Sequence, residues 1–207
     1  MSMASWFRRG GVVAGGVVVS VLLAACSAGS PAEPPSASGG PTTESSTSSD
    51  PSGVEIADPK DAMAVDECQL LTAEAAQKVG VRAQGEKKKE NLTLPDEDPK
   101  TCIWESASGS TSIFLTVLSD RSIQQYYDNP DYFVDFKKLR IAGYPAVRAN
   151  QDDPMTGGSC DVFLASKRNQ VVKSTSFLPS DEVGTVDPCE LSKQALELSV
   201  SSWPDAE

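Results

Sequence analysis

The sequence predicts an α+β domain in which an antiparallel β-sheet of about five or six strands packs against N- and C-terminal helices. Three observations support this fold class. Three pairs of β-type segments are each joined by a short turn, helix-start signals lie before and after these pairs, and four cysteines are spread through the same region. Segments joined by tight turns pair as antiparallel hairpins, and helices outside them can cover the sheet.

The expected strands are rich in β-branched and aromatic residues and are separated by Gly, Pro, Asn or Ser, which favour turns. The three hairpins are expected over 101–105 with 111–118, over 136–141 with 146–149, and over 160–165 with 171–177. A short helix is expected over 120–127, because Asn129-Pro130 would end it.

Two segments carry the signals of helix starts. Asp187-Pro188-Cys189-Glu190 offers an N-cap Asp, Pro at the first helical position and a Glu three residues after the cap. The apolar residues that follow share one helical face, so a terminal helix should end before Pro204. Asp66-Glu67-Cys68-Gln69 is a similar helix-start sequence, with an N-cap Asp and a Gln three residues later. Gly80 stands where the C′ residue of the following helix is expected.

The first 25 residues have the composition of an export leader. Arg8 and Arg9 precede an apolar run, 12–23, which is well short of the roughly 20 residues of a membrane-spanning helix. Leu23-Ala24-Ala25-Cys26 resembles the bacterial lipobox. The resemblance implies that Cys26 receives a diacylglycerol and becomes the first residue of the mature chain. The paired arginines leave the general secretory and the twin-arginine routes both open.

Residues 26–60 are expected to form a disordered tether behind the lipidated cysteine. Between residues 27 and 53 there is no Leu, Ile, Val or aromatic side chain, so little apolar area could offset the entropy of ordering. A glycosylated stalk is the alternative, since Ser and Thr are dense beside Pro. The single globular domain is expected over 61–207.

Four cysteines fall in the expected domain: Cys68, Cys102, Cys160 and Cys189. An even number in an exported chain predicts two disulfides. A metal site is the alternative, but the sequence has no Cys-x-x-Cys pair to chelate an ion, so no metal site is expected. The favoured pairing joins each helix start to a strand start, Cys68 with Cys102 and Cys160 with Cys189. The other two pairings stay open.

Composition excludes several classes of function. The chain has 29 acidic and 18 basic residues, a net charge of −11, and no histidine. The negative charge argues against nucleic-acid binding. The absence of histidine excludes Ser-His-Asp and Cys-His nucleophiles and His-ligated zinc. We therefore expect no enzyme activity, no cofactor and no metal.

Carboxylates are the remaining material for acid–base chemistry. Asp96-Glu97-Asp98 and Asp152-Asp153 are expected to be solvated loop charges, because nothing apolar lies nearby. Calcium binding by Asp152, Asp153 and Asp161 would lack the spacing of a known calcium loop.

An aromatic cluster around Asn129-Pro130 is the candidate contact surface. Burial beneath a loop is the alternative and is the commoner state of aromatic side chains. The candidate residues are Tyr126, Tyr127, Asp131, Tyr132 and Phe133.

Short motifs along the domain resemble those of a family of actinobacterial secreted lipoproteins, which includes mycobacterial Lpp- and Lpq-type proteins and is catalogued as a domain of unknown function. The motifs are Asp66-x-Cys68, Cys102-x-Trp104, Gly143-Tyr144-Pro145-Ala146 and Asp187-Pro188-Cys189. The first departs from the usual Asp-Pro-Cys of that family. The resemblance implies a cell-envelope location and supplies no catalytic residues.

Taken together, these features predict a lipid-anchored, non-catalytic binding or interaction module on the extracytoplasmic face of the cell membrane. Its partner would be an envelope protein or a small molecule. One alternative is a hydrolase of cell-wall glycan, which would need two carboxylates about 5–10 Å apart in one cleft. A second is a sensor or carrier of a small ligand or lipid, and a third is a structural coat lipoprotein.

Overall fold

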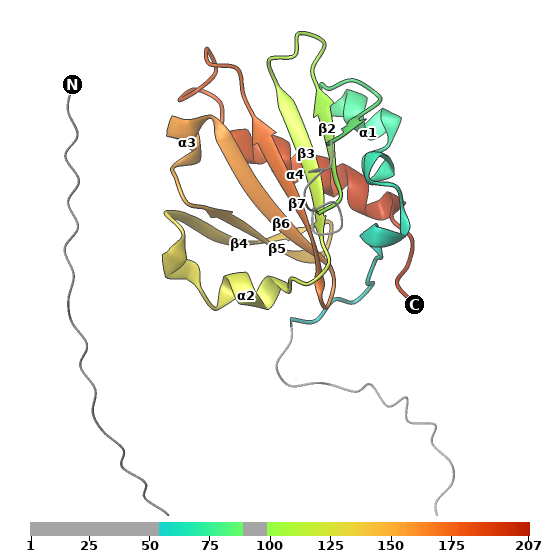
Figure 1. The fold of residues 1–207 in the computed structure, drawn as a ribbon. Helices are drawn as coiled ribbons and strands as arrows, with labels where there is room; N and C mark the ends of the chain where they lie inside the picture. The colour runs from blue at the N-terminus through green and yellow to red at the C-terminus, as the bar shows by residue number, and fades with distance from the viewer. Residues whose placement is uncertain (1–53, 89–98) are drawn as a thin grey trace, which may run out of the picture. The chain divides into compact units, whose positions relative to one another are not determined.

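A single antiparallel sheet dominates the computed structural model, which describes residues 54–88 and 99–207 (Figure 1). The sheet has seven strands in the order β1-β2-β3-β7-β6-β5-β4. The strands are β1 (Glu86–Lys87), β2 (Thr101–Glu105), β3 (Ser112–Leu118), β4 (Asp135–Ile141), β5 (Tyr144–Asn150), β6 (Ser159–Lys167) and β7 (Gln170–Phe177).

The expected strand number of five or six was wrong, because β1 adds a seventh strand. Its two residues, Glu86 and Lys87, pair with Ile103 and Cys102 at the edge of the sheet. Two residues are too short to show a period-2 pattern, so nothing in this lysine-rich segment indicated a strand.

Three hairpins, β2–β3, β4–β5 and β6–β7, supply the other six strands. They are joined side by side through β3–β7 and β5–β6, which are also antiparallel pairs. The β3–β7 pairing is long-range and aligns Phe114 with Thr175 and Thr116 with Lys173. These two residue pairs become the centre of the candidate site.

The helical elements are short except for the last one. They are η1 (Ala62–Ala64), η2 (Glu67–Gln69), α1 (Ala73–Lys78), α2 (Ile123–Tyr127), η3 (Pro130–Tyr132), α3 (Pro154–Gly157), α4 (Pro188–Ser199) and η4 (Val200–Ser202). The C-terminal helix α4 is confirmed as predicted. The Asp187 carboxylate accepts a hydrogen bond from the Cys189 backbone N–H at 2.9 Å, and Pro188 occupies the first turn.

The two faces of the sheet have different coverings. Side chains alternate between faces along a strand, and one set, which includes Trp104, Leu115 and Leu164, packs against Ala195 and Leu196 of α4. In Figure 1, α4 crosses behind the sheet. The opposite face carries a smaller cluster, in which Ile123 and Tyr126 of α2 pack on strand residues that include Phe163. Helix α2 has only five residues and covers only one end of this second face.

The two expected disulfides are present, with the favoured pairing. Cys68–Cys102 joins η2 to β2, and Cys160–Cys189 joins β6 to the first turn of α4. Three of the four cysteines are at most 3% exposed. The bonds therefore link the N-terminal segment and the terminal helix to the sheet within the core.

Several predictions concern residues outside those that the structure describes. These are the leader over 1–25, lipidation at Cys26, the tether up to Gly53 and the acidic run Asp96-Glu97-Asp98. Within the described residues, no helix is both long and apolar enough to cross a membrane.

Candidate ligand-binding face

The candidate site is the part of the second sheet face that α2 leaves uncovered, and we call it the open face. Its floor is formed by alternate residues of β3, β7 and β6. The strand registers place Thr175 beside Phe114 and Asp161, and Lys173 beside Thr116 and Phe163. Tyr126 of α2 and Phe177 at the end of β7 border this floor.

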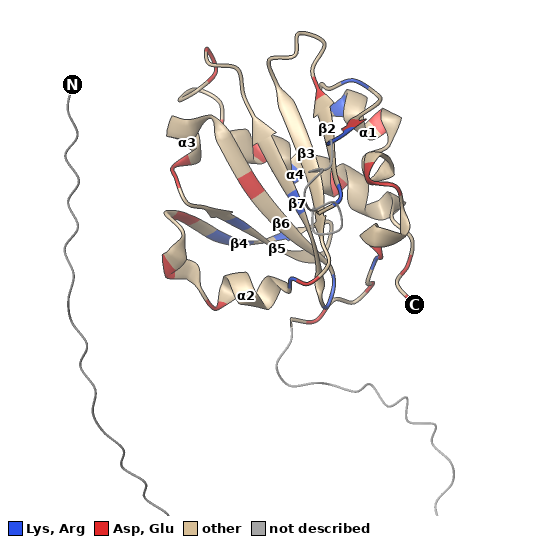
Figure 2. Cartoon of the chain, in the orientation of Figure 1, with Lys and Arg blue, Asp and Glu red and all other residues tan. Residues whose placement is uncertain are grey.

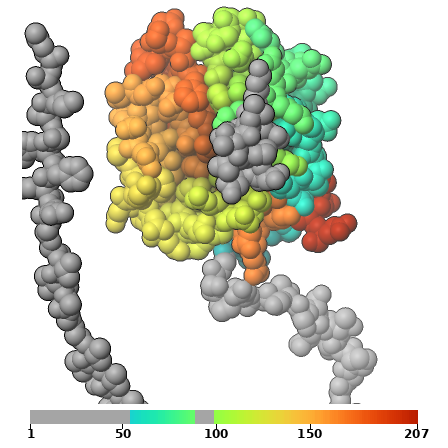
Figure 3. Space-filling model, viewed as in Figure 1, coloured from blue at the N-terminus to red at the C-terminus, as the bar shows by residue number. Residues whose placement is uncertain are grey.

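Two adjoining cavities hollow the open face. The view of Figure 3 is that of Figure 1, in which α4 lies behind the sheet. The larger, of about 510 Å³, lies toward β5 and α3, and the smaller, of about 430 Å³, lies toward β2 and β3. Both volumes fall within the range of small-ligand sites. The cavities share four lining residues: Phe163, Lys173, Thr175 and Phe177.

The polar centre of the open face is organised around Asp161. The Thr175 hydroxyl donates a hydrogen bond of 2.5 Å to its carboxylate, and the Lys173 Nζ lies 3.8 Å from the other carboxylate oxygen. The backbone N–H of Asp161 donates to the Asn150 side-chain oxygen at 2.6 Å. About a third of the Lys173 and Asp161 side chains remains exposed, so both can still contact a ligand.

Two aromatic pairs stand on either side of this centre. Tyr126 packs on Phe163 with ring centroids 4.4 Å apart, and Phe114 contacts Phe177 edge to face at 5.4 Å. Burial raises the pKa of the Tyr126 hydroxyl, although the nearby Arg121 charge opposes this shift. Tyr126 therefore contributes a neutral ring and hydroxyl to the face.

The two cavities carry opposite charge. Asp152, Asp153 and Asp161 line the larger one together with Lys173. Lys88, Arg121 and Lys173 line the smaller one, and none of the described residues that line it is acidic. Figure 2 shows basic and acidic residues on the strands of this face. A dipolar surface of this kind can select a ligand by charge as well as by shape.

The residues of the predicted contact surface lie along α2 and η3, at the border of the open face. Tyr126 is buried and lines the smaller cavity, while Phe133 stacks near it at 6.2 Å and lines the larger one. The Tyr127 hydroxyl instead donates to the Ala146 carbonyl at 3.0 Å and fixes α2 to β5. Asp131 and Tyr132 are exposed, Tyr132 by 70%.

Sequence reasoning missed the floor of the open face. The signal was present in β7, where Lys173, Thr175 and Phe177 recur at every second position and must share a face. Asp161 was considered only as a calcium ligand, because its pairing with Thr175 depends on the β6–β7 register. Asp152 and Asp153 do reach the same cavity as Asp161, although they lie on a loop.

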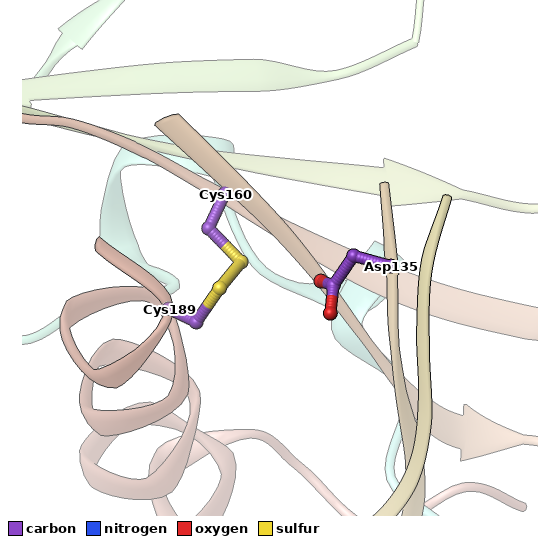
Figure 4. A group of neighbouring side chains, drawn as sticks. All are labelled: Asp135, Cys160 and Cys189. Atoms are coloured by element: carbon purple, nitrogen blue, oxygen red, sulfur yellow. A yellow bond between two sulfur atoms is a disulfide. The ribbon is translucent and has the colours of Figure 1, made fainter. Parts of the chain in front are cut away.

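One group of potential metal ligands converges among the described residues: Asp135, Cys160 and Cys189, whose donor atoms lie within 4.8 Å of one another (Figure 4). The two sulfur atoms are bonded to each other, and a metal needs thiolates. The Asp135 carboxylate is already paired with Arg148 at 2.6 Å and accepts from Asn150 at 2.8 Å. This group is therefore a disulfide beside an ion pair.

Residues 21–202 match the model of a family described as a protein of unknown function. A search of curated proteins found no significant match. The matched segment includes both disulfides and every residue of the open face named above.

Proposed function

The chain belongs to the DUF3558 family of proteins of unknown function, and on that premise we propose that it is a lipid-anchored, non-catalytic binding module of the cell envelope. The open face of its sheet would hold the ligand, and the acylated Cys26 would hold the protein at the extracytoplasmic side of the membrane. The finer resemblance to actinobacterial lipoproteins belongs to this proposal.

The observation that carries the proposal is the incomplete covering of the sheet. A sheet in a two-layer α+β domain normally buries one face and leaves the other polar and solvated. Here the uncovered part instead combines two cavities, two aromatic pairs and a Lys173–Asp161 ion pair whose side chains are still partly exposed. Concave surfaces with apolar walls and a few convergent polar groups are typical of ligand sites.

The anchor rests on the leader and on Cys26. Each buried CH₂ of an acyl chain contributes about 0.8 kcal/mol, so a diacylglycerol with two chains holds a protein durably. The family match begins at residue 21, so the segment around Cys26 lies within the matched region.

Replacing Cys26 by Ser should release the protein from the membrane fraction of its native host. The expected result is a shift of most of the protein from the membrane pellet to the soluble or secreted fraction. A Ser27→Cys variant that keeps Cys26 is the matched control and should stay in the pellet. Full retention of the Cys26→Ser protein in the membrane would contradict lipid anchoring.

A ligand in envelope extract should perturb the open face and no other surface. We expect NMR signals of Phe163, Lys173 and Thr175 to shift when fractionated small molecules from the host envelope are added to the ¹⁵N-labelled chain from residue 26 onward, carrying Cys26→Ser. Signals of Gln194, exposed on α4 behind the sheet, should not move. A Thr175→Trp variant, which fills the shared floor of the cavities, should lose the shifts, whereas Gln194→Trp should keep them.

The outcome separates the proposal from its rivals. Shifts confined to α4, or shifts that survive in a folded Thr175→Trp protein, would contradict the open face as the binding surface. Urea unfolding of both Trp variants establishes that they are folded.

A second function, hydrolysis of cell-wall glycan by two carboxylates, is favoured by the cavity that Asp152, Asp153 and Asp161 share. Two of these carboxylates already accept hydrogen bonds from other groups of the domain. Asp153 caps α3 by accepting from the Met155 N–H at 2.8 Å, and Asp161 accepts from Thr175. Release of soluble sugar from wall material by the wild-type protein, abolished in Asp161→Asn, would favour the hydrolase over the binding module.

A further inference from the structure

We infer that the smaller cavity of the open face binds a single anionic amphiphile, a molecule with a phosphate or carboxylate group joined to a short apolar chain. The inference rests on the proposed binding function and adds the chemical class of the ligand. Its basis is the set of described residues that line the cavity, which combines cations with no acid, threonine hydroxyls whose protons are committed within the protein, and apolar walls.

The charge of the cavity opposes that of the whole chain. The protein has 11 more acidic than basic residues, yet Lys88, Arg121 and Lys173 line this cavity and no acidic side chain of the described residues lines it. Among the described residues, Lys173 pairs with Asp161 at 3.8 Å. Neither Lys88 nor Arg121 has an acidic partner in the part of the chain that the structure describes. A local positive field on an acidic protein attracts an anion to this place.

The threonine hydroxyl groups of the cavity do not provide free protons for an anion. Thr101 donates to the Pro99 carbonyl at 3.1 Å, so in the Thr101–Thr116 hydrogen bond of 3.0 Å it must accept from Thr116. The Thr175 hydroxyl donates to Asp161. Because these three protons are committed within the protein, the charged nitrogens of Lys88, Arg121 and Lys173 are the main donors to a bound anion.

The apolar walls determine the rest of the ligand. Phe114 and Phe177 form one wall and Tyr126 and Phe163 form the other. Leu118, two residues beyond Thr116 on β3, adds a further apolar side chain to the lining. Phe177 is 43% exposed, which is a large exposure for an aromatic side chain. Burying these surfaces favours a ligand with a hydrocarbon portion by roughly 25 cal/mol per Å² of apolar area. A free inorganic anion would leave them exposed.

Titration with decyl phosphate tests the inference directly. We expect saturable binding to the chain from residue 26 onward, carrying Cys26→Ser, and affinity that weakens as salt is added, because partly exposed charges are screened. In Arg121→Gln/Lys173→Gln the affinity should fall about tenfold or more, since two charge-assisted contacts are lost. The matched control, Lys78→Gln/Lys137→Gln, removes the same charge from exposed positions that line neither cavity and should bind like the parent protein.

Other ligands distinguish the elements of the inference. Inorganic phosphate binding as tightly as decyl phosphate would show that the apolar walls are not used, and decanol binding as tightly would show that the cations are not used. Binding to phosphatidylglycerol vesicles without binding to monomeric decyl phosphate would assign the site to a bilayer surface. Decyl phosphate binding that appears only in Asp96→Asn/Glu97→Gln/Asp98→Asn would identify the chain's own carboxylates as the occupant. Each of these four results would overturn the inference.

If the anionic amphiphile is not the ligand, the proposed binding function can still be tested separately. If envelope extract shifts the NMR signals of the open face while decyl phosphate does not bind, the binding function stands and the ligand class is wrong. If neither has any effect, both are wrong.

Discussion

The double variant Cys160→Ala/Cys189→Ala is expected to lose about 4 kcal/mol of unfolding free energy relative to the wild type. The bond closes a segment of 29 residues, and the loop-closure entropy of such a segment corresponds to about 3.6 kcal/mol. Both cysteines are at most 3% exposed, so the missing sulfur atoms add a small packing loss. Small domains are stable by only about 5–15 kcal/mol, so this loss is a large share of the total.

Urea denaturation at equilibrium measures this loss and also identifies its cause. If the disulfide acts mainly by restricting the unfolded chain, the variant should show a steeper dependence of unfolding free energy on urea, because its unfolded state exposes more surface. An unchanged slope with the same loss would instead assign the effect to packing in the native state.

The second disulfide provides the comparison for this experiment. Cys68–Cys102 closes 34 residues, which corresponds to about 3.8 kcal/mol by the same entropy relation. Cys68 is partly exposed, whereas its partner is buried. The Cys68→Ala/Cys102→Ala variant should therefore lose a similar amount. A loss below about 1 kcal/mol in both variants would contradict the role of the disulfides as the main cross-links of the fold.

The elements that the sequence predicted are those with local signals. The three hairpins follow from alternating residues around short turns, and α4 follows from Asp187-Pro188 and its apolar face. The disulfide pairing could be favoured because each cysteine lay near the start of a predicted helix or strand. Each of these features depends on residues close together in the sequence.

The features that could not be predicted depend on contacts between distant segments. The β3–β7 pairing brings Phe114 beside Thr175, which is 61 residues later in the chain, and nothing in either strand specifies that neighbour. Gly85 also depends on contacts with a distant segment, because a Cβ there would lie 2.5 Å from the Cys102 sulfur and 2.6 Å from the Trp104 ring. The need for glycine at this position becomes visible only in the folded structure. The open face was missed for the same reason, since three strands contribute to its floor.

Replacing Gln170 by Leu is expected to cost roughly 3 kcal/mol of unfolding free energy, because it leaves buried polar groups without partners. Gln170 is 2% exposed, and its side-chain oxygen accepts from the Ala62 backbone N–H at 2.7 Å and from the Ser166 hydroxyl at 2.8 Å. Its amide donates to Asp61 at 2.9 Å. Leucine has a similar volume, so the loss should come from the unpaired Ala62 N–H and the lost side-chain hydrogen bonds rather than from a cavity. The Ser166 hydroxyl keeps a partner, because it also donates to the backbone carbonyl of residue 170 at 3.2 Å. Gln194→Leu, exposed on α4, is the matched control and should change stability by less than about 0.5 kcal/mol.

The pH dependence of this loss provides an independent check, because Gln170 is one of the groups that lower the pKa of Asp61. An ion pair with Lys167 is the largest cause, the Gln170 amide is the second, and the pKa falls below 3.8. A carboxyl whose pKa is lower in the folded state stabilises the protein above its unfolded pKa, and this contribution disappears as the pH falls through the folded value. Removing the Gln170 amide takes away part of that contribution. The difference in unfolding free energy between wild type and Gln170→Leu should therefore be greatest above about pH 5 and should shrink below pH 3.8. A difference that stays constant across this range would show that Gln170 stabilises η1 without acting on Asp61.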